Sequence, residues 1–190
     1  MWFAIQTMTG REQEMIDLLV DLADRQSYHR VFFIRRETVW RREGRCIVHT
    51  EALFPGYVFV ESDDPEKLYM ELKKIPKFSK MLGKEEITGG ADDDGILFHN
   101  VSPDEQEFLE NLIDGNEDCV VRLSTIELDD NSNIIRCEGP LRHYQDKIVK
   151  KRVRLRYVMI RISLLGRTRD IKLGIRIQKE RMLNMLDMAD

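Results

Sequence analysis

The stretch Leu53-Phe54-Pro55-Gly56-Tyr57-Val58-Phe59-Val60 decides how the first half of the chain folds. Its last four residues are apolar and predict a strand, which directs Val58 and Val60 to one face and Tyr57 and Phe59 to the other. A small α+β domain covers one face of its sheet with its own helices. The rings on the second face are therefore either buried within the domain or exposed as an interface with another protein.

Strands and helices are interleaved on both sides of this stretch. The sequence predicts strands over residues 2–7, 31–34 and 56–61, a hairpin over 35–48 with its tip at Gly44, and helices over 11–24 and 65–75. A third helix follows Ser102, because Ser102-Pro103-Asp104-Glu105 is a helix-capping sequence. Residues 89–95 are expected to form a loop. Together these elements predict an α+β domain over residues 1–113, with an antiparallel sheet and flanking helices.

The pattern changes after residue 113. The polar segment 114–119 is interpreted as a linker. From residue 120 onwards, short apolar strands alternate with turns, one of them over residues 129–133. Five such strands within about 60 residues predict a small all-β barrel over residues 120–178. The remaining tail, residues 179–190, favours one or two helical turns.

The net charge of −4 hides a strong separation of charge along the chain. Residues 139–181 carry a net charge of +11, whereas the residues before them carry −13. A basic block of this density indicates an anionic partner, most often nucleic acid. Because nucleic acid would repel the acidic part of the chain, the sequence predicts two surfaces with different partners.

The residue types that commonly act in catalysis or metal binding are not spaced for either role. The three cysteines are odd in number and widely spaced, and the four histidines lack metal-ligand spacing, which disfavours disulfides, zinc and other metals. Neither a phosphate-binding nor a dinucleotide-binding glycine motif occurs. We therefore expect no catalytic residues, no metal, no cofactor and no enzymatic activity. Without a basic leader or a membrane-length apolar run, we expect cytoplasmic localisation and no membrane partner.

Two sets of motifs, in this order, resemble the NusG family of bacterial transcription regulators. The first set, which resembles the family's N-terminal NGN domain, consists of Trp2–Thr7, Gly10-Arg11-Glu12 and Leu53–Val60. The second set, which resembles the C-terminal KOW domain (an SH3-like barrel), consists of Gly139-Pro140-Leu141, Tyr144, Ile148-Val149 and Leu164-Leu165-Gly166-Arg167. Within the family, Gln6-Thr7, Gly10-Arg11-Glu12 and Arg122–Leu128 are most similar to the LoaP subfamily of specialised paralogues.

The resemblance implies that the first domain binds bacterial RNA polymerase at the clamp helices of its largest catalytic subunit. Family members bridge the polymerase cleft, keep the clamp closed and thereby suppress pausing and termination. The pocket for the clamp helices would comprise Trp2, Phe3, Phe54, Pro55, Gly56, Tyr57 and Phe59. Within it, Gly56 would allow a close approach of the backbone at the start of the strand.

The predicted hairpin is rich in arginine. The candidate contacts to upstream or non-template DNA, near which the family places this side of the domain, are Arg35, Arg36, Arg41 and Arg42, with Arg45 beside them. The planar fork of arginine suits phosphate because it donates two hydrogen bonds. The alternative is a solvated edge that its charges protect from aggregation.

The basic block of the KOW domain is the stronger candidate for a nucleic-acid surface. Its candidate RNA contacts are Arg142, His143, Tyr144, Lys147, Lys150, Lys151, Arg152, Arg154, Arg156, Arg167, Arg169 and Lys172. We expect Tyr144 and His143 to stack on unpaired bases and the cations to hold phosphates. The alternatives are a basic face without a ligand or one that binds a protein.

Three hypotheses follow. The first is a LoaP-like regulator that promotes processive elongation and antitermination, with its KOW domain on a structured leader in the nascent RNA. The second is a general NusG-type elongation factor that couples polymerase to a termination factor or the ribosome. His143 and Asp146 stand where KOW domains commonly have glycine, which disfavours this coupling. The third is an RNA-binding module that does not bind polymerase.

Overall fold

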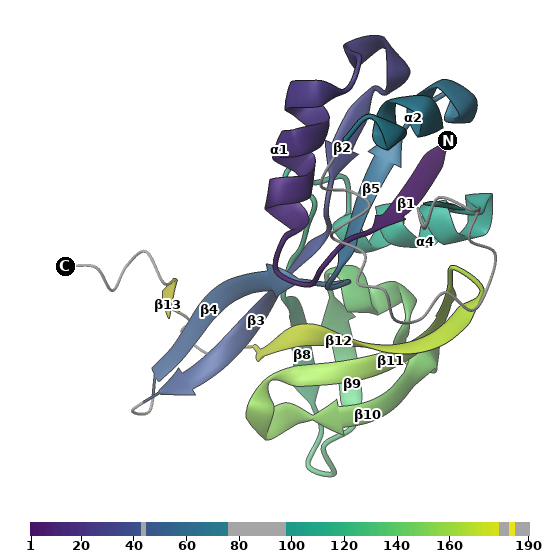
Figure 1. Cartoon of the computed structure of the whole chain (residues 1–190). Helices are drawn as coiled ribbons and strands as arrows, with labels where there is room; N and C mark the ends of the chain where they lie inside the picture. Colours follow the sequence, from purple (N-terminus) through teal and green to yellow (C-terminus); the bar gives the residue numbers. More distant parts are fainter. Residues whose placement is uncertain (43–44, 76–97, 179–182, 185–190) are drawn as a thin grey trace. The chain divides into compact units, whose positions relative to one another are not determined.

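The computed structural model describes residues 1–42, 45–75, 98–178 and 183–184. The chain divides into two compact units (Figure 1), the first made of residues 1–33 and 54–106, the second of residues 34–53 and 107–190. The hairpin after residue 34, which the sequence placed in the first domain, thus groups with the C-terminal part. The expected loop over residues 89–95 and the tip at Gly44 lie outside the described residues.

The first unit holds an antiparallel sheet in the order β2-β5-β1-β6. Its strands are β1 (Trp2–Gln6), β2 (Arg30–Phe32), β5 (Tyr57–Glu61) and β6 (Phe98–Asn100). Two helices, α1 (Glu12–Leu22) and α2 (Pro65–Lys73), contribute to one core with the sheet. That core consists of Phe3, Ile5, Met15, Leu19, Ala23, Tyr28, Val58, Val60, Leu68, Leu72 and Ile75.

Side-chain capping bonds stand at the start of two of the described helices, and the one at Ser102 was predicted from the sequence. Asp64 accepts a hydrogen bond from the Lys67 backbone N–H (2.9 Å) at the start of α2. At α4 (Pro103–Ile113), Ser102 Oγ accepts from Glu105 N (3.3 Å), and Glu105 Oε2 accepts from Ser102 N (2.9 Å), which is a reciprocal capping box. At α1, Arg11 occupies the N-cap position without a side-chain capping bond.

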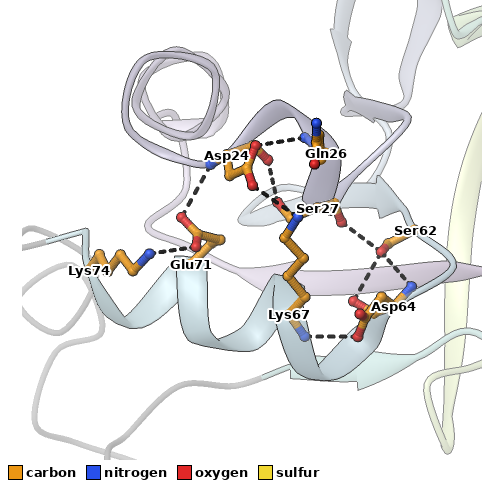
Figure 2. A network of polar contacts seen from close by, with 8 residues as sticks. All are labelled: Asp24, Gln26, Ser27, Ser62, Asp64, Lys67, Glu71 and Lys74. Atoms are coloured by element: carbon orange, nitrogen blue, oxygen red, sulfur yellow. Dashed lines mark hydrogen bonds and ion pairs between the residues drawn. The ribbon is translucent and has the colours of Figure 1, made fainter.

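A polar network links the short 3-10 helix η1 (Arg25–Ser27) to both ends of α2 (Figure 2). The Asp24 carboxylate pairs with Lys67 (2.9 Å), and the Asp24 backbone N–H donates to Glu71 (3.2 Å). Ser62 Oγ donates to the Ser27 carbonyl (2.7 Å). These bonds hold the turn after α1 against α2, so the two helices cover the same face of the sheet.

The second unit contains a five-stranded sheet in the order β10-β11-β12-β8-β9. Its strands are β8 (Ser124–Leu128), β9 (Ile134–Glu138), β10 (Ile148–Arg152), β11 (Tyr157–Leu164) and β12 (Arg167–Ile177). The β8–β12 pair is parallel and the other pairs are antiparallel. Strands β10 and β9 lie at the two ends of this order, so closure into a barrel stays a prediction.

Three short 3-10 helices interrupt the strand pattern, where the sequence led us to expect strands and turns alone. They are η2 (Pro140–His143), η3 (Gln145–Lys147) and η4 (Val153–Leu155). The last one separates β10 from β11, where the alternation of apolar residues changes phase near Arg156. Arg156 adopts a left-handed backbone (φ 58°) and thereby ends the 3-10 turn.

A second sheet of this unit has the order β13-β4-β3-β7. Strands β3 (Arg35–Arg42) and β4 (Arg45–Ala52) are the predicted hairpin, β7 (Val120–Val121) runs parallel to β3, and β13 (Leu183–Asn184) runs parallel to β4. The strand at Leu183–Asn184 replaces the helical turn expected there. The predicted linker is tied to the hairpin, because Arg35 N donates to the Cys119 carbonyl (3.0 Å).

The hairpin packs closely on the five-stranded sheet at Gly174 of β12. A Cβ atom at Gly174 would lie 2.4 Å from the Glu37 carbonyl oxygen, which leaves room only for glycine. On either side, Arg36 donates to the Lys172 carbonyl (2.8 Å) and the Glu37 carboxylate accepts from Leu123 N (2.8 Å). The second unit therefore has one continuous framework of hairpin and sheet.

Among the helices that the structure describes, none is both long and apolar enough to cross a membrane.

Candidate protein and nucleic-acid interfaces

Four aromatic rings cluster on the face of the first sheet opposite the helix core. Trp2 lies edge-on to Phe32 (4.9 Å between ring centroids), and Phe59 lies 5.9 Å from Phe32 and 6.1 Å from Phe54. The antiparallel register explains the cluster, because β5 lies between β1 and β2 and pairs with both. The sequence analysis did not include Phe32 in this cluster. Its position next to Val31 in a predicted strand could have indicated that its ring lies on this face.

Most of these rings are buried within the domain, which is one of the two alternatives that the sequence left open. Trp2, Phe54 and Phe59 expose 5%, 4% and 0% of their surface, and with Phe32 they pack in edge-on, tilted and stacked pairs. Phe3 lies on the other face and belongs to the helix core. Of the predicted polymerase contacts, Pro55 is exposed and Tyr57 is half-buried.

Gly56 positions Pro55 and Tyr57 through a tight turn. It has a φ of 81°, and a Cβ atom there would lie 2.9 Å from the Thr7 carbonyl oxygen, so the predicted close approach of the backbone is confirmed. The Gly56 N–H donates to the buried Glu12 carboxylate (2.6 Å), and its carbonyl accepts from Thr7 N (2.8 Å). These bonds fix the turn that presents Pro55 at the surface.

The hairpin arginines divide into structural and exposed groups. Arg36 pairs with Glu51 (2.9 Å), donates to the Lys172 carbonyl and keeps only 15% of its side chain exposed. Arg35 is half-buried and donates to the Asp118 carbonyl (3.2 Å). Arg41 and Arg45 are exposed. The side chain of Arg42 lies outside the described part of the structure.

Two of the predicted RNA contacts are buried. The Tyr144 ring packs against Phe108 (4.9 Å), its hydroxyl donates to the Phe108 carbonyl (3.3 Å), and burial raises the pKa of Tyr144. Arg156 is 7% exposed and its guanidinium donates to the Val153 carbonyl of its own turn. Neither side chain is placed to meet RNA, so these two predictions are corrected. His143 beside them is exposed.

The remaining cations of the five-stranded sheet fall on several surfaces. Those that are exposed are Arg142, Lys147, Lys150, Lys151, Arg152, Arg154 and Arg167, and those that are half-buried are Arg169 and Lys172. The strand register places Lys150, Met159 and Lys172 in one row and Arg152 beside Tyr157 in the next. This shared row of cations is the part of the basic block that forms a common face.

Two aromatic residues on the second unit were not among the predicted contacts. Trp40 on β3 is 55% exposed, and Tyr157 on β11 lies half-buried with Lys172 Nζ 4.8 Å from its ring centroid. Trp40 stands directly before two arginines, which was a sequence signal for stacking beside phosphate contacts. Tyr157 gave no such signal because it fits the apolar alternation of its strand.

No group of three or more potential ligands arranged to hold a metal ion is found in the described ranges. The thiols are not poised for reaction either. Cys46 and Cys119 are buried, and burial raises the pKa of the half-buried Cys137 to about 11, which disfavours its thiolate. In the described residues, the aromatic cluster of the first unit is largely buried, whereas the second unit exposes many cations.

The chain is similar in sequence to NusG proteins. Residues 1–90 match the family model described as transcription termination factor nusG. Two proteins from strains of Helicobacter pylori, each named transcription termination/antitermination protein NusG, are 21% and 20% identical over 177 residues, covering 90% of this chain and 93% of each relative. A solved structure described as domain interaction in Thermotoga maritima NusG has 14% identity and a TM-score of 0.43, covering 91% of this chain and 92% of that one.

The chain combines an α+β unit with a mainly β unit that carries the basic block. Residues 1–90 are similar to the NusG family model, and the whole chain is similar to the two Helicobacter pylori NusG proteins.

Proposed function

We propose that this chain is a non-enzymatic, cytoplasmic transcription regulator that binds bacterial RNA polymerase through its first unit and promotes processive elongation and antitermination. The match of residues 1–90 to the NusG family carries this proposal. The site would receive the clamp helices of the largest catalytic subunit. A LoaP-like role, rather than general NusG function, is proposed from the basic second unit and the sequence resemblance described above.

The polymerase surface centres on Pro55 and Tyr57 in this proposal. Both flank the Gly56 turn, and both retain exposed surface while the neighbouring rings of Trp2, Phe54 and Phe59 are buried. The buried rings support the surface and do not contact the partner. A partly exposed tyrosine on a rigid turn provides a large apolar contact at low entropic cost.

A binding assay with the isolated clamp helices tests the polymerase contact. Tyr57→Ala should abolish retention of the clamp helices, whereas Tyr57→Phe should retain most of it because the ring remains. Thermal unfolding of both variants checks that the first unit is intact. Unchanged binding by a folded Tyr57→Ala protein would contradict the proposed contact.

The second unit is proposed to bind a structured leader in the nascent RNA. Its support is the set of exposed cations on the five-stranded sheet, with Arg41 on the hairpin as a further phosphate contact to RNA or to upstream or non-template DNA. Binding through phosphates releases counterions, so the affinity should fall steeply with salt. A general NusG-type role would instead require binding to a termination factor or the ribosome.

Titration of the full chain with a structured leader RNA at low and high salt separates these roles. The full chain is needed because the hairpin packs on β12 and would be lost from a fragment that starts at residue 120. We expect tight, salt-sensitive binding to the leader. Equally weak binding to every RNA tested would remove the LoaP-like role and favour the general one.

A further inference from the structure

Trp40 is an exposed tryptophan held in a fixed position. Its ring lies over His49, with 3.7 Å between the ring centroids and a 40° tilt, and 55% of the residue remains exposed. His49 itself is buried and its Nε2 shares a hydrogen bond with Thr38 Oγ1 (3.0 Å). A large apolar ring that is both immobilised from below and open to solvent is suited to receive another ring.

Tyr157 provides a second ring on the outer face of the five-stranded sheet. Its cross-strand neighbours are Arg152 on β10 and Gly174 on β12. Lys172 Nζ lies 4.8 Å from its ring centroid, in a cation–π contact. The ring is half-buried, so part of it is accessible beside two cations.

The two rings belong to adjoining surfaces of the same unit. Arg36 lies on the same face of β3 as Trp40, and it donates to the Lys172 carbonyl (2.8 Å), which joins that face to β12. The side chain of Lys172 continues over Tyr157. Trp40 lies four positions along β3 from Arg36, a distance of about 13 Å.

The charges on these faces favour a polyanion. Lys150, Arg152 and Lys172 share the outer face of the sheet with Tyr157. On the described faces of β3–β4 and β10–β12, the carboxylates are already paired, Glu51 with Arg36 (2.9 Å) and Asp170 with Arg161 (2.8 Å). The cations beside Tyr157 therefore keep their charge available for phosphates.

We propose that this surface, formed by Trp40, Tyr157, Lys150, Arg152 and Lys172, binds an unpaired RNA strand. Bases stack on the two rings, because every base has a flat face. The three cations bind the backbone phosphates, because each phosphodiester carries one negative charge. The inference rests on the proposed function in taking RNA as the ligand. It adds a site for unpaired RNA. In this site Trp40 and Tyr157 stack on the bases, a role that was expected of Tyr144, which is buried.

Intrinsic fluorescence of the full chain tests this directly, because the protein has two tryptophans in different settings. Trp2 is 5% exposed and Trp40 is 55% exposed, so quenching by RNA should come from Trp40. Titration with oligouridine of about 12 nucleotides should quench the emission. In Trp40→Phe the quenching should disappear while binding, followed by anisotropy of a labelled RNA, is largely retained.

Loss of either ring should weaken binding of the oligouridine roughly 5- to 100-fold. Trp40→Ala and Tyr157→Ala test this, and Tyr157→Phe should bind like the parent protein because the ring is kept. Lys150→Gln should weaken binding, whereas the matched charge change Arg25→Gln in the first unit should not. Parent-like affinity in both alanine variants would overturn the site, as would equal effects of Lys150→Gln and Arg25→Gln.

Two further arms separate this inference from the proposed function. If a structured leader RNA binds tightly but oligouridine does not, the site for unpaired RNA is wrong and the proposed function stands. If neither RNA binds, the proposed RNA function fails. A DNA strand of matching sequence that binds more tightly than the RNA, or an acidic peptide that quenches Trp40 equally well, would overturn the assignment to RNA.

Discussion

Glu12 links the start of α1 to the turn before β5. Its Oε1 atom accepts hydrogen bonds from the backbone N–H groups of Gly56 (2.6 Å) and Gly10 (3.1 Å), and the residue is buried. A single carboxylate thereby satisfies two donors that the neighbouring backbone does not reach. Since Pro55 and Tyr57 flank this turn, one side chain in the helix shapes the proposed polymerase surface.

We predict that Glu12→Ala lowers the free energy of unfolding by about 1–3 kcal/mol, because it leaves the buried Gly56 N–H without its acceptor. Denaturant unfolding measures this. Glu14→Ala, which removes an exposed ion pair with Arg11 (3.5 Å), is the control and should change stability by less than about 1 kcal/mol. Similar values for the two variants would show that the Glu12 bonds contribute little.

At the scale of elements, the β3–β4 hairpin contains a titratable group. Burial lowers the pKa of His49 below its ordinary value of 6.5, Glu51 acts in the opposite direction and Lys172 acts with burial. Burial dominates because Trp40 lies over the His49 ring. The folded hairpin therefore holds a neutral histidine where the unfolded chain would hold a partly charged one.

We predict that the hairpin loses stability as the pH falls below 6.5, the ordinary pKa of histidine. The sign follows from the lowered pKa: the unfolded state binds the proton more readily, so acidification favours unfolding, whereas stability is fully retained at higher pH. Thermal unfolding midpoints across this range measure the effect. His49→Gln should remove that part of the pH dependence, and an unchanged pH profile in the variant would exclude His49 as its source.

The contact between the hairpin and β12 depends on one glycine. We predict that Gly174→Ala destabilises the second unit by about 1–3 kcal/mol, because the new methyl group meets the Glu37 carbonyl. It should also weaken oligouridine binding, since the contact joins the faces that hold Trp40 and Tyr157. The control, Ser163→Ala on the exposed outer face of β11, should change neither property. Parent-like stability of Gly174→Ala would mean that the hairpin packs more loosely than described.

At the scale of the whole molecule, the charge separation along the chain predicts two functions that can be removed separately. Tyr57→Ala should lose the clamp helices and keep RNA affinity, whereas Lys150→Gln combined with Arg152→Gln should do the reverse. Parallel binding assays with both partners measure this. A variant that loses both partners while remaining folded would contradict the assignment of one partner to each unit.

Much of the local structure follows from short-range chemistry that the sequence displays. The capping box of Ser102 and Glu105 and the strand at Tyr57–Glu61 were predicted, because each depends on neighbouring residues. The separation of charge also follows from the sequence, because charged residues can be counted without a structure. The sequence by itself therefore determined the elements and the separation of charge.

Only the tertiary structure decided which side chains remain accessible. Trp2 is buried and packs against Phe32 from another strand. Tyr144 is buried and packs against Phe108 from a helix. Trp40 is exposed although its residue type favours burial. Periodicity assigns a residue to a face of its own element, but burial depends on what packs on that face. That contact is made by residues far away in the sequence, so no local pattern contains it.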